Sequence, residues 1–180
     1  MKKYALWGLL SAGLLMGGIA RADFYAGAGL GFGFNGGSSS NGTHTSKYKD
    51  SSVWSIAGGY EAPLPLFDVR GELEYLHTRP ELKDGRTKQL DGLFLNGYAD
   101  IPLIPFIDPY VGLGVGRVRF DHSNSFAFQG MLGAEYELPF APIAIAGEYR
   151  YLKINETTGK YHRDSQYHTN ILMLKARYMF

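Results

Sequence analysis

Acidic and basic residues recur at alternate positions in segments that are otherwise apolar. Glu72 and Glu74 flank Leu73, and Arg150 lies between two tyrosines. Charged groups that leave water must pair with opposite charges, and side chains on one face of neighbouring strands are close enough to do so. The sequence therefore predicts a network of paired charges inside the fold, with these members: Arg70, Glu72, Glu74, Glu135, Glu148, Arg150, Lys175 and Arg177.

Other residues that could do chemistry form no recognisable site. Gly31, Gly33 and Gly36 match GxGxxG, but they belong to a longer alternating series and no helical pattern follows, so no nucleotide loop is predicted. His122 and Ser123 are adjacent, which by itself makes no nucleophile and base pair. Five histidines are scattered in polar segments and are expected to be solvated: His44, His77, His122, His162 and His168. We expect no cofactor, no metal and no enzymatic activity.

The composition excludes several classes of protein. The 180 residues, enough for one domain, include 24 Gly, 13 Tyr and 11 Phe, with 45% hydrophobic and 19% charged residues. Such a chain is neither a disordered polar tract nor a helical membrane protein. The absence of Cys excludes disulfides and thiolate chemistry, and a net charge of +1 offers no broad basic surface for nucleic acid.

Residues 1–22 have the three parts of a secretory signal peptide. Lys2 and Lys3 precede an apolar stretch over residues 5–19, which ends in the small-residue sequence Ala-Arg-Ala at positions 20–22. A retained membrane anchor is the alternative, but the apolar stretch is shorter than the roughly 20 residues that a spanning helix needs. We therefore expect a signal peptide at 1–22 and a single mature domain at 23–180.

Eight segments after residue 22 alternate between apolar and small or polar residues, which is the pattern of β-strands with two different faces. A soluble sandwich would bury the apolar faces, whereas a membrane barrel would turn them toward lipid. The segments lie near residues 24–34, 52–61, 67–77, 91–101, 109–120, 126–138, 143–152 and 169–180.

The connections between these segments favour the membrane barrel. Seven of the eight prolines mark three short connections, after the second, fourth and sixth segments, because proline cannot donate to a β-ladder. The other connections, at 35–51, 78–90, 121–125 and 153–168, are more polar and mostly longer. Short turns at one rim and longer loops at the other are typical of outer-membrane barrels.

The C-terminus carries a further signal. Phe180 is the last residue, and Tyr178, Ala176 and Leu174 share its face. Together with "FYAGAGLGFGF", "PYVGLGVG" and "GEYRYL", this ending resembles the small bacterial outer-membrane barrels of the opacity-porin and OmpA-like type. The resemblance implies an all-β, eight-stranded, antiparallel, up-and-down transmembrane β-barrel in the bacterial outer membrane. It also implies that the barrel-assembly machinery reads Tyr178 and Phe180.

An eight-stranded barrel is only wide enough for side chains to fill its lumen. Pairing the last two segments with Ile143 near Phe180 places Glu148 opposite Lys175. We expect these charges to close most of the lumen, and a narrow porin that passes small ions or solutes is the alternative.

Arg117 and Arg119 share a face with apolar residues at one end of the fifth segment. Two interpretations are open. A β-bulge could turn both side chains inward, or both could face outward and bind the phosphates of lipopolysaccharide, for which Arg is well suited.

The family resemblance implies a role at the cell surface. Connections 35–51 and 153–168 mix aromatic and charged residues, including Tyr48 and Tyr167, and could bind a host or surface ligand as adhesins do. Lipid A deacylases of similar size carry a His-x-Ser pair after the seventh strand, but residues 151–154 here read Tyr-Leu-Lys-Ile. A structural or adhesin-like role is therefore favoured over a narrow porin, and a lipid A-modifying enzyme is the least favoured.

Overall fold

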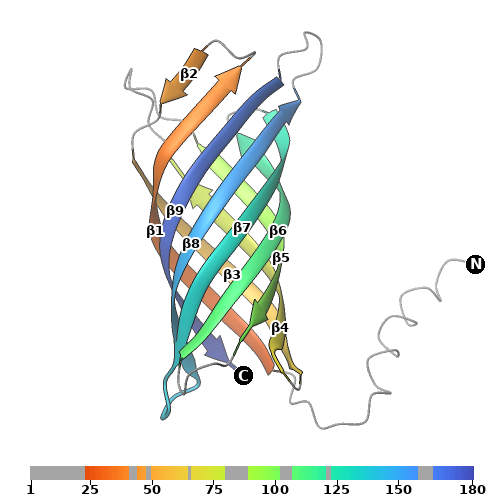
Figure 1. Ribbon diagram of the computed structural model, residues 1–180, viewed down its shortest axis with the longest axis vertical. Helices are drawn as coiled ribbons and strands as arrows, with labels where there is room; N and C mark the ends of the chain where they lie inside the picture. Colours follow the sequence, from red (N-terminus) through yellow and green to blue (C-terminus); the bar gives the residue numbers. More distant parts are fainter. Residues whose placement is uncertain are drawn as a thin grey trace, which may run out of the picture.

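The computed structural model describes residues 23–40, 44–47, 50–64, 66–79, 89–101, 107–120, 123–157 and 164–180 (Figure 1). The predicted signal peptide at 1–22 lies outside these residues. Among the described residues, no helix is long and apolar enough to cross a membrane.

The structure is a closed antiparallel barrel. Its sheet order is β2-β1-β3-β4-β5-β6-β7-β8-β9, and an additional pairing of β1 with β9 closes the circle. Eight strands form the wall, as predicted, while β2 pairs only with the end of β1. The strands are β1 (Asp23–Ser40), β2 (His44–Lys47), β3 (Ser51–Pro63), β4 (Asp68–Thr78), β5 (Leu90–Asp100), β6 (Ile107–Phe120), β7 (Ser123–Glu137), β8 (Ile143–Thr157) and β9 (Asp164–Met179).

The two rims of the barrel differ. The lower rim of Figure 1 carries the short connections 64–67, 101–106 and 138–142 together with Phe180. At the upper rim, two connections are shorter than predicted. β1 continues to Ser40, β8 continues to Thr157, and β9 already begins at Asp164. The backbone of these polar segments stays paired, so predicted connections 35–51 and 153–168 are partly strand.

The strands are strongly staggered. A path that starts at Tyr25 and steps from each residue to its ladder partner on the next strand passes through Glu72 and Gln129 and reaches Thr169 on β9. Thr169 is next to Asn170, the residue that pairs with Phe34 of β1. The path therefore returns to β1 displaced by about ten residues, which requires strongly tilted strands, while the number of only eight wall strands keeps the interior narrow.

The predicted register of the last two strands was wrong by two residues. Ile143 pairs with Tyr178 rather than lying near Phe180, and Glu148 pairs with Met173 rather than Lys175. The reason is the closure of the barrel. The N–H of Phe180 donates to the carbonyl of Phe24 on β1 at 2.9 Å, so the last residue serves the seam and not the β8–β9 ladder.

The outer surface is apolar, with aromatic side chains gathered toward both rims. Phe24 and Tyr60 pack edge to face near the lower rim, and Phe126 and Phe128 do so near the upper rim. Exposed aliphatic residues such as Leu113 fill the band between them. The structure thus has the apolar-out arrangement of a membrane barrel and not the buried apolar face of a soluble sandwich.

Candidate functional site in the barrel interior

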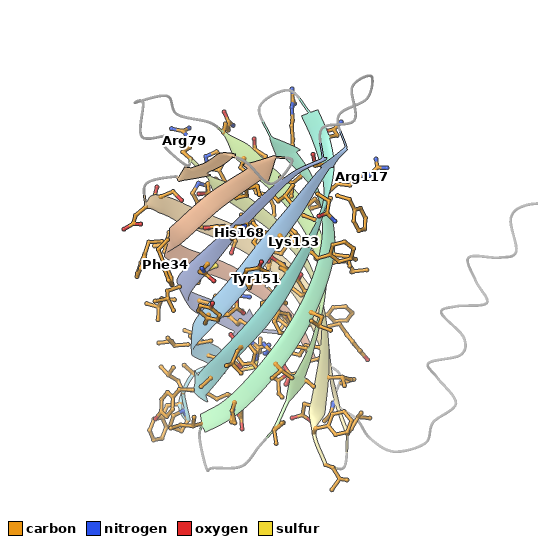
Figure 2. All side chains as sticks on the ribbon, turned by 45° about the horizontal axis from the view of Figure 1, so that its top comes forward. Phe34, Arg79, Arg117, Tyr151, Lys153 and His168 are labelled. Atoms are coloured by element: carbon orange, nitrogen blue, oxygen red, sulfur yellow. The ribbon has the colours of Figure 1, made fainter. Side chains whose placement is uncertain are left out.

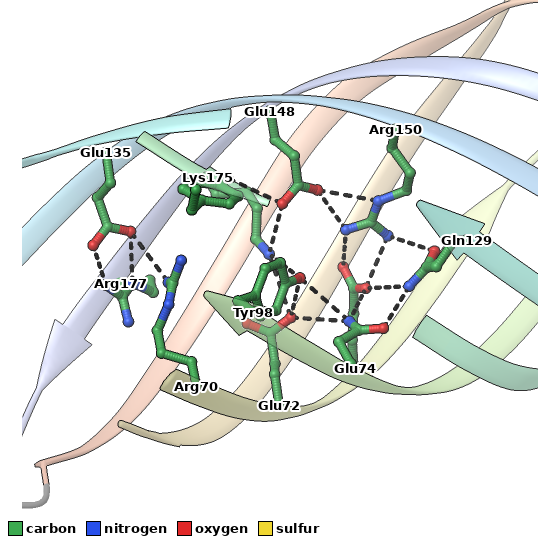
Figure 3. A network of polar contacts seen from close by, with 12 residues as sticks. Arg70, Glu72, Glu74, Tyr98, Gln129, Glu135, Glu148, Arg150, Lys175 and Arg177 are labelled. Carbon is green, nitrogen blue, oxygen red and sulfur yellow. Dashed lines mark hydrogen bonds and ion pairs between the residues drawn. The ribbon is translucent and has the colours of Figure 1, made fainter. Parts of the chain in front are cut away.

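Alternate residues of the wall strands project into the lumen, and the predicted charges all lie there. Each of the eight side chains is at most 5% exposed. They form two groups, shown in Figure 3. The central group comprises Glu72, Glu74, Glu148, Arg150 and Lys175, and the lower group comprises Arg70, Glu135 and Arg177.

Arg150 lies at the middle of the central group. Its Nη1 and Nη2 donate to the two carboxylate oxygens of Glu74 at 2.8 and 3.1 Å. Its Nη2 and Nε both donate to Glu148 Oε1, at 2.6 and 3.1 Å, and its Nη1 also donates to Gln129 Oε1 at 3.1 Å. Every nitrogen of this fully buried guanidinium is therefore hydrogen-bonded.

Lys175 joins the remaining carboxylates of the central group. Its Nζ lies 3.3 Å from Glu72 Oε1 and 3.6 Å from Glu148 Oε2. The contact with Glu148 exists despite the corrected register, because the two residues are diagonal rather than direct neighbours. Asn96 links Glu72 and Glu74. Its Nδ2 donates to Glu72 Oε1 at 3.1 Å and to Glu74 Oε2 at 2.9 Å.

The lower group is built in the same way. Arg70 donates from Nε and Nη2 to the two oxygens of Asp100 at 2.7 and 2.6 Å, and its Nη1 lies 3.5 Å from Glu135. Arg177 donates to Glu135 from Nε at 2.7 Å and also from Nη2. Its Nη1 reaches Glu61 at 2.9 Å, so each arginine here contacts two carboxylates.

Three buried tyrosines connect the two groups. Tyr25 and Tyr98 donate to Glu72 at 3.1 and 3.0 Å, and Tyr110 donates to Glu148 at 3.0 Å. The guanidinium of Arg70 lies 4.8 and 4.9 Å from the ring centroids of Tyr98 and Tyr110, close enough for cation–π attraction. Sequence reasoning missed these residues as interior groups, although Tyr25 shares its face with the glycines of the first strand.

Apolar side chains fill the upper lumen, which the alternation did not predict. Leu76 follows Glu74 on the inner face of β4, Leu152 follows Arg150 on β8, and Phe94 lies above Asn96 on β5. We call this cluster the apolar plug; it consists of Val53, Leu76, Leu90, Phe94, Val118, Ala127, Leu152, Ile154, Tyr167, Ile171 and Met173.

The chemistry of the interior is that of a structural network. Its charged groups are paired and hydrogen-bonded in a site withdrawn from water, where a satisfied network rigidifies the protein. The described residues contain no group of three or more His, Asp or Glu side chains placed to hold a metal ion. The arrangement therefore stabilises the wall and fills the lumen.

The family of this barrel is decided by its sequence match. Residues 8–180 match the family described as outer membrane protein beta-barrel domain. The chain belongs to this family. It is accordingly a bacterial outer-membrane protein, and the short connections at its lower rim mark the periplasmic side.

Solved structures share the fold of this outer-membrane barrel at low sequence identity. Neisserial surface protein A, NspA, aligns with a TM-score of 0.63 at 19% identity, covering 88% of this chain and 99% of that one. The outer membrane enzyme PagL aligns with a TM-score of 0.52 at 13% identity, covering 84% and 97%. OprG from Pseudomonas aeruginosa aligns with a TM-score of 0.49 at 15% identity, covering 89% and 97%. No curated protein sequence matches the chain.

The remaining predicted residues of the outer-membrane barrel lie outside the lumen. Arg117 and Arg119 are exposed on the outer face of β6, whose ladders with β5 and β7 run without a register shift. The inward turn by a β-bulge is therefore excluded. Tyr178 and Phe180 lie on the outer surface at the lower rim, with ring centroids 5.1 Å apart.

Some residues assigned to surface loops lie elsewhere. Tyr167 is buried in the apolar plug and is not a loop residue, because β9 begins at Asp164. His77 is part of β4 and is largely buried, with Nδ1 2.7 Å from Asp91 Oδ1, so the expectation of a solvated side chain was wrong there. His168 stacks on Tyr151. The backbone of His44 belongs to β2, and His122, His162, Tyr48 and residues 158–163 lie outside the described residues.

Proposed function

We propose that the protein is a closed outer-membrane barrel with a structural or adhesin-like role, acting through the surface it presents outside the cell. The observation that carries the proposal is the filling of the lumen by two successive layers, the apolar plug and the charge network below it. A pore for solutes needs a continuous wet path, and both layers oppose one.

Each layer opposes permeation for a different physical reason. The apolar plug places the fully buried side chains of Leu76, Phe94 and Leu152 in the path, and these side chains cannot replace the water around a solute. In the central group, Arg150 and Glu74 bind each other in a bidentate pair, so a passing ion would have to break buried ion pairs. Closure leaves the outside surface as the part of the barrel that meets other molecules.

The upper rim supports a role in binding. β1, β8 and β9 continue past the residues where the charge network ends, and β2 folds back onto β1 through pairs such as Gly37 with Lys47 (Figure 1). The wall is thus extended within the two predicted ligand-binding connections, 35–51 and 153–168. We therefore assign the ligand, a host or surface molecule, to these two connections and the strand ends that carry them.

Conductance measurements test the closure. Purified, refolded protein in planar bilayers is expected to give no sustained openings across pH 5–8 and at voltages that leave the bilayer intact. Reproducible unitary currents that scale with protein concentration would overturn the closed barrel and would support the narrow porin instead.

Binding assays on whole cells test the second part of the proposal. Replacing residues 41–49 and 158–163 with short Gly-Ser linkers is expected to abolish adhesion to host cells or matrix-coated surfaces while the barrel still assembles. The matched control replaces residues 80–88, another upper-rim connection, and is expected to leave adhesion intact. Adhesion that survives the first replacement, or that the control removes equally, contradicts this assignment.

A further inference from the structure

Three cations on the upper outer surface have no partner among the residues that the structure describes. Arg117 and Arg119 project from β6 and Lys153 from β8, all on the membrane-facing side. Figure 2 labels Arg117 and Lys153. None of the three forms a hydrogen bond or an ion pair with the described residues. A cation is costly on the outer surface at mid-membrane and costs little near the interface, so the position of these residues near the upper rim lets them meet anionic headgroups.

Two phenylalanines lie between these cations. Phe126 pairs directly with Arg117, and Phe128 pairs directly with Lys153. The arginines and the lysine thus stand on either side of β7, separated across the sheet by two inter-strand spacings, or about 10 Å. A ligand that reaches both sides must carry anionic groups at separate points and an apolar body between or below them.

An apolar groove lies below the cations on the same outer face, with Lys153 nearest to it. It has a volume of about 670 Å³ and runs across β5 to β8, with Gly97, Leu113, Gly130 and Tyr151 among its lining residues. Gly97 pairs with Leu113, Leu113 with Gly130, and Gly130 with Tyr151, so the hollow follows a row in which two residues lack side chains. Lys153 stands two residues above Tyr151, which is about 7 Å along the strand.

We propose that this surface binds one molecule of lipid A from the outer leaflet. Arg117, Arg119 and Lys153 hold the phosphates of its disaccharide, and an acyl chain occupies the groove beside Gly130. Lipid A fits this surface because the cations and the apolar groove adjoin at the outer interface. Lipid A has its phosphates and its acyl chains adjoining at the same depth. The site does not depend on the adhesin-like role proposed above, since none of its residues belongs to the upper-rim connections.

A second groove provides an internal comparison. It has a volume of about 500 Å³ and is lined by Leu30, Trp54, Ile56 and Leu174 on β1, β3 and β9. The described outer faces of β1 and β3 carry no Lys or Arg. If apolar shape alone attracted lipid, both grooves would bind alike, whereas a phosphate-dependent site predicts binding at the β5–β8 groove only.

Native mass spectrometry of the full mature barrel in detergent tests the site. The probes are bisphosphorylated lipid A, the same lipid A without phosphates, and phosphatidylglycerol. Arg117→Ala, Arg119→Ala, Lys153→Ala removes the cations, and Gly130→Leu fills the groove at a position where a new Cβ meets no atom within 4 Å. Arg79→Ala at the upper rim and Ala28→Leu in the second groove are the matched controls.

We expect one bisphosphorylated lipid A to bind at least tenfold more tightly than its dephosphorylated form. The triple variant should lose this preference, Gly130→Leu should weaken both forms, and both controls should bind as the unaltered protein does. The proposal is overturned if the unaltered protein does not discriminate phosphate, if the controls weaken binding equally, or if phosphatidylglycerol binds as tightly and with the same dependence on the cations. Heat-modifiable migration in gels verifies that every variant is folded.

Discussion

Arg150 shows what a single residue contributes to this barrel. It is fully buried and satisfies Glu74 and Glu148 at once. Removing one partner of a buried ion pair leaves an uncompensated charge, which typically costs about 3–5 kcal/mol. We therefore expect Arg150→Met to lower the free energy of unfolding by about this amount, measured by urea titration in lipid vesicles.

Two further variants make this test specific. Arg79→Ala removes an exposed arginine and is expected to change the free energy of unfolding by less than about 0.5 kcal/mol. Adding Glu74→Gln and Glu148→Gln to Arg150→Met removes the stranded charges and should recover much of the lost stability. A loss below about 1 kcal/mol in the single variant contradicts a stabilising role for the pair.

At the same scale, the sequence predicted the charges better than their partners. The parity of Glu72, Glu74 and Arg150 identified the inward face, because a charge is too costly on a membrane-facing surface. The same parity applies to Tyr98, Tyr110 and the apolar plug, yet their side chains suit lipid as well as an interior. Alternation alone does not separate the two environments for such residues.

Among the elements, β6 shows why glycines occupy the strands. An alanine Cβ at Gly114 would lie 2.8 Å from Gln129 Cγ and 3.0 Å from Gln129 Nε2, and would also contact Asn96 Oδ1. The neighbouring strands therefore need a bare backbone on β6 so that their amide side chains can cross the lumen to the carboxylates. The glycine is a packing requirement of the charge network.

A matched pair of substitutions tests this requirement. Gly114→Ala is expected to destabilise the barrel by about 1–3 kcal/mol, as overpacking of an interior does, in urea unfolding followed by tryptophan fluorescence. Gly130→Ala, in the adjacent strand but facing outward with no atom within 4 Å of the new Cβ, is expected to be neutral. Equal effects of the two substitutions would show that strand propensity, and not the lumen contact, decides the outcome.

The strands themselves were largely predictable, but their ends and register were not. Prolines such as Pro63, together with the alternation, placed the wall strands because both reflect local backbone chemistry. The β8–β9 register depends on the seam between Phe24 and Phe180, which is a property of the closed barrel. β2 and the extensions of β1 and β9 consist of polar residues whose pairing only their neighbours dictate.

Over the whole molecule, charge is distributed unevenly between the rims. Glu61, Asp100, Asp108, Glu135 and Glu137 lie toward the lower rim, against Arg70 and Arg177. Toward the upper rim, among the residues that the structure describes, Arg79, Arg117, Arg119 and Lys153 lie with Asp50 and Asp91. The acidic excess of the described residues therefore lies at the lower rim, and the membrane-facing cations lie at the rim that connection length assigns to the outer leaflet.

Phe180 takes part in closure of the fold and is also the predicted signal for assembly in the cell. Phe180 is 74% exposed, and its ring adds little to the interior, whereas its N–H completes the seam with β1. Phe180→Ala keeps that N–H, so we expect stability after refolding in vitro to change little. If the barrel-assembly machinery reads this ring, the amount of heat-modifiable protein in the outer membrane should instead fall several-fold.

Phe24→Ala separates the two effects. Phe24 is 65% exposed on the same lower rim and contacts Tyr60, so its removal takes away a similar membrane-facing ring without altering the C-terminus. We expect normal outer-membrane levels for this variant. Equal losses for both variants would mean that the ring at Phe180 acts through membrane anchoring, and a normal level for Phe180→Ala would mean that assembly does not depend on it.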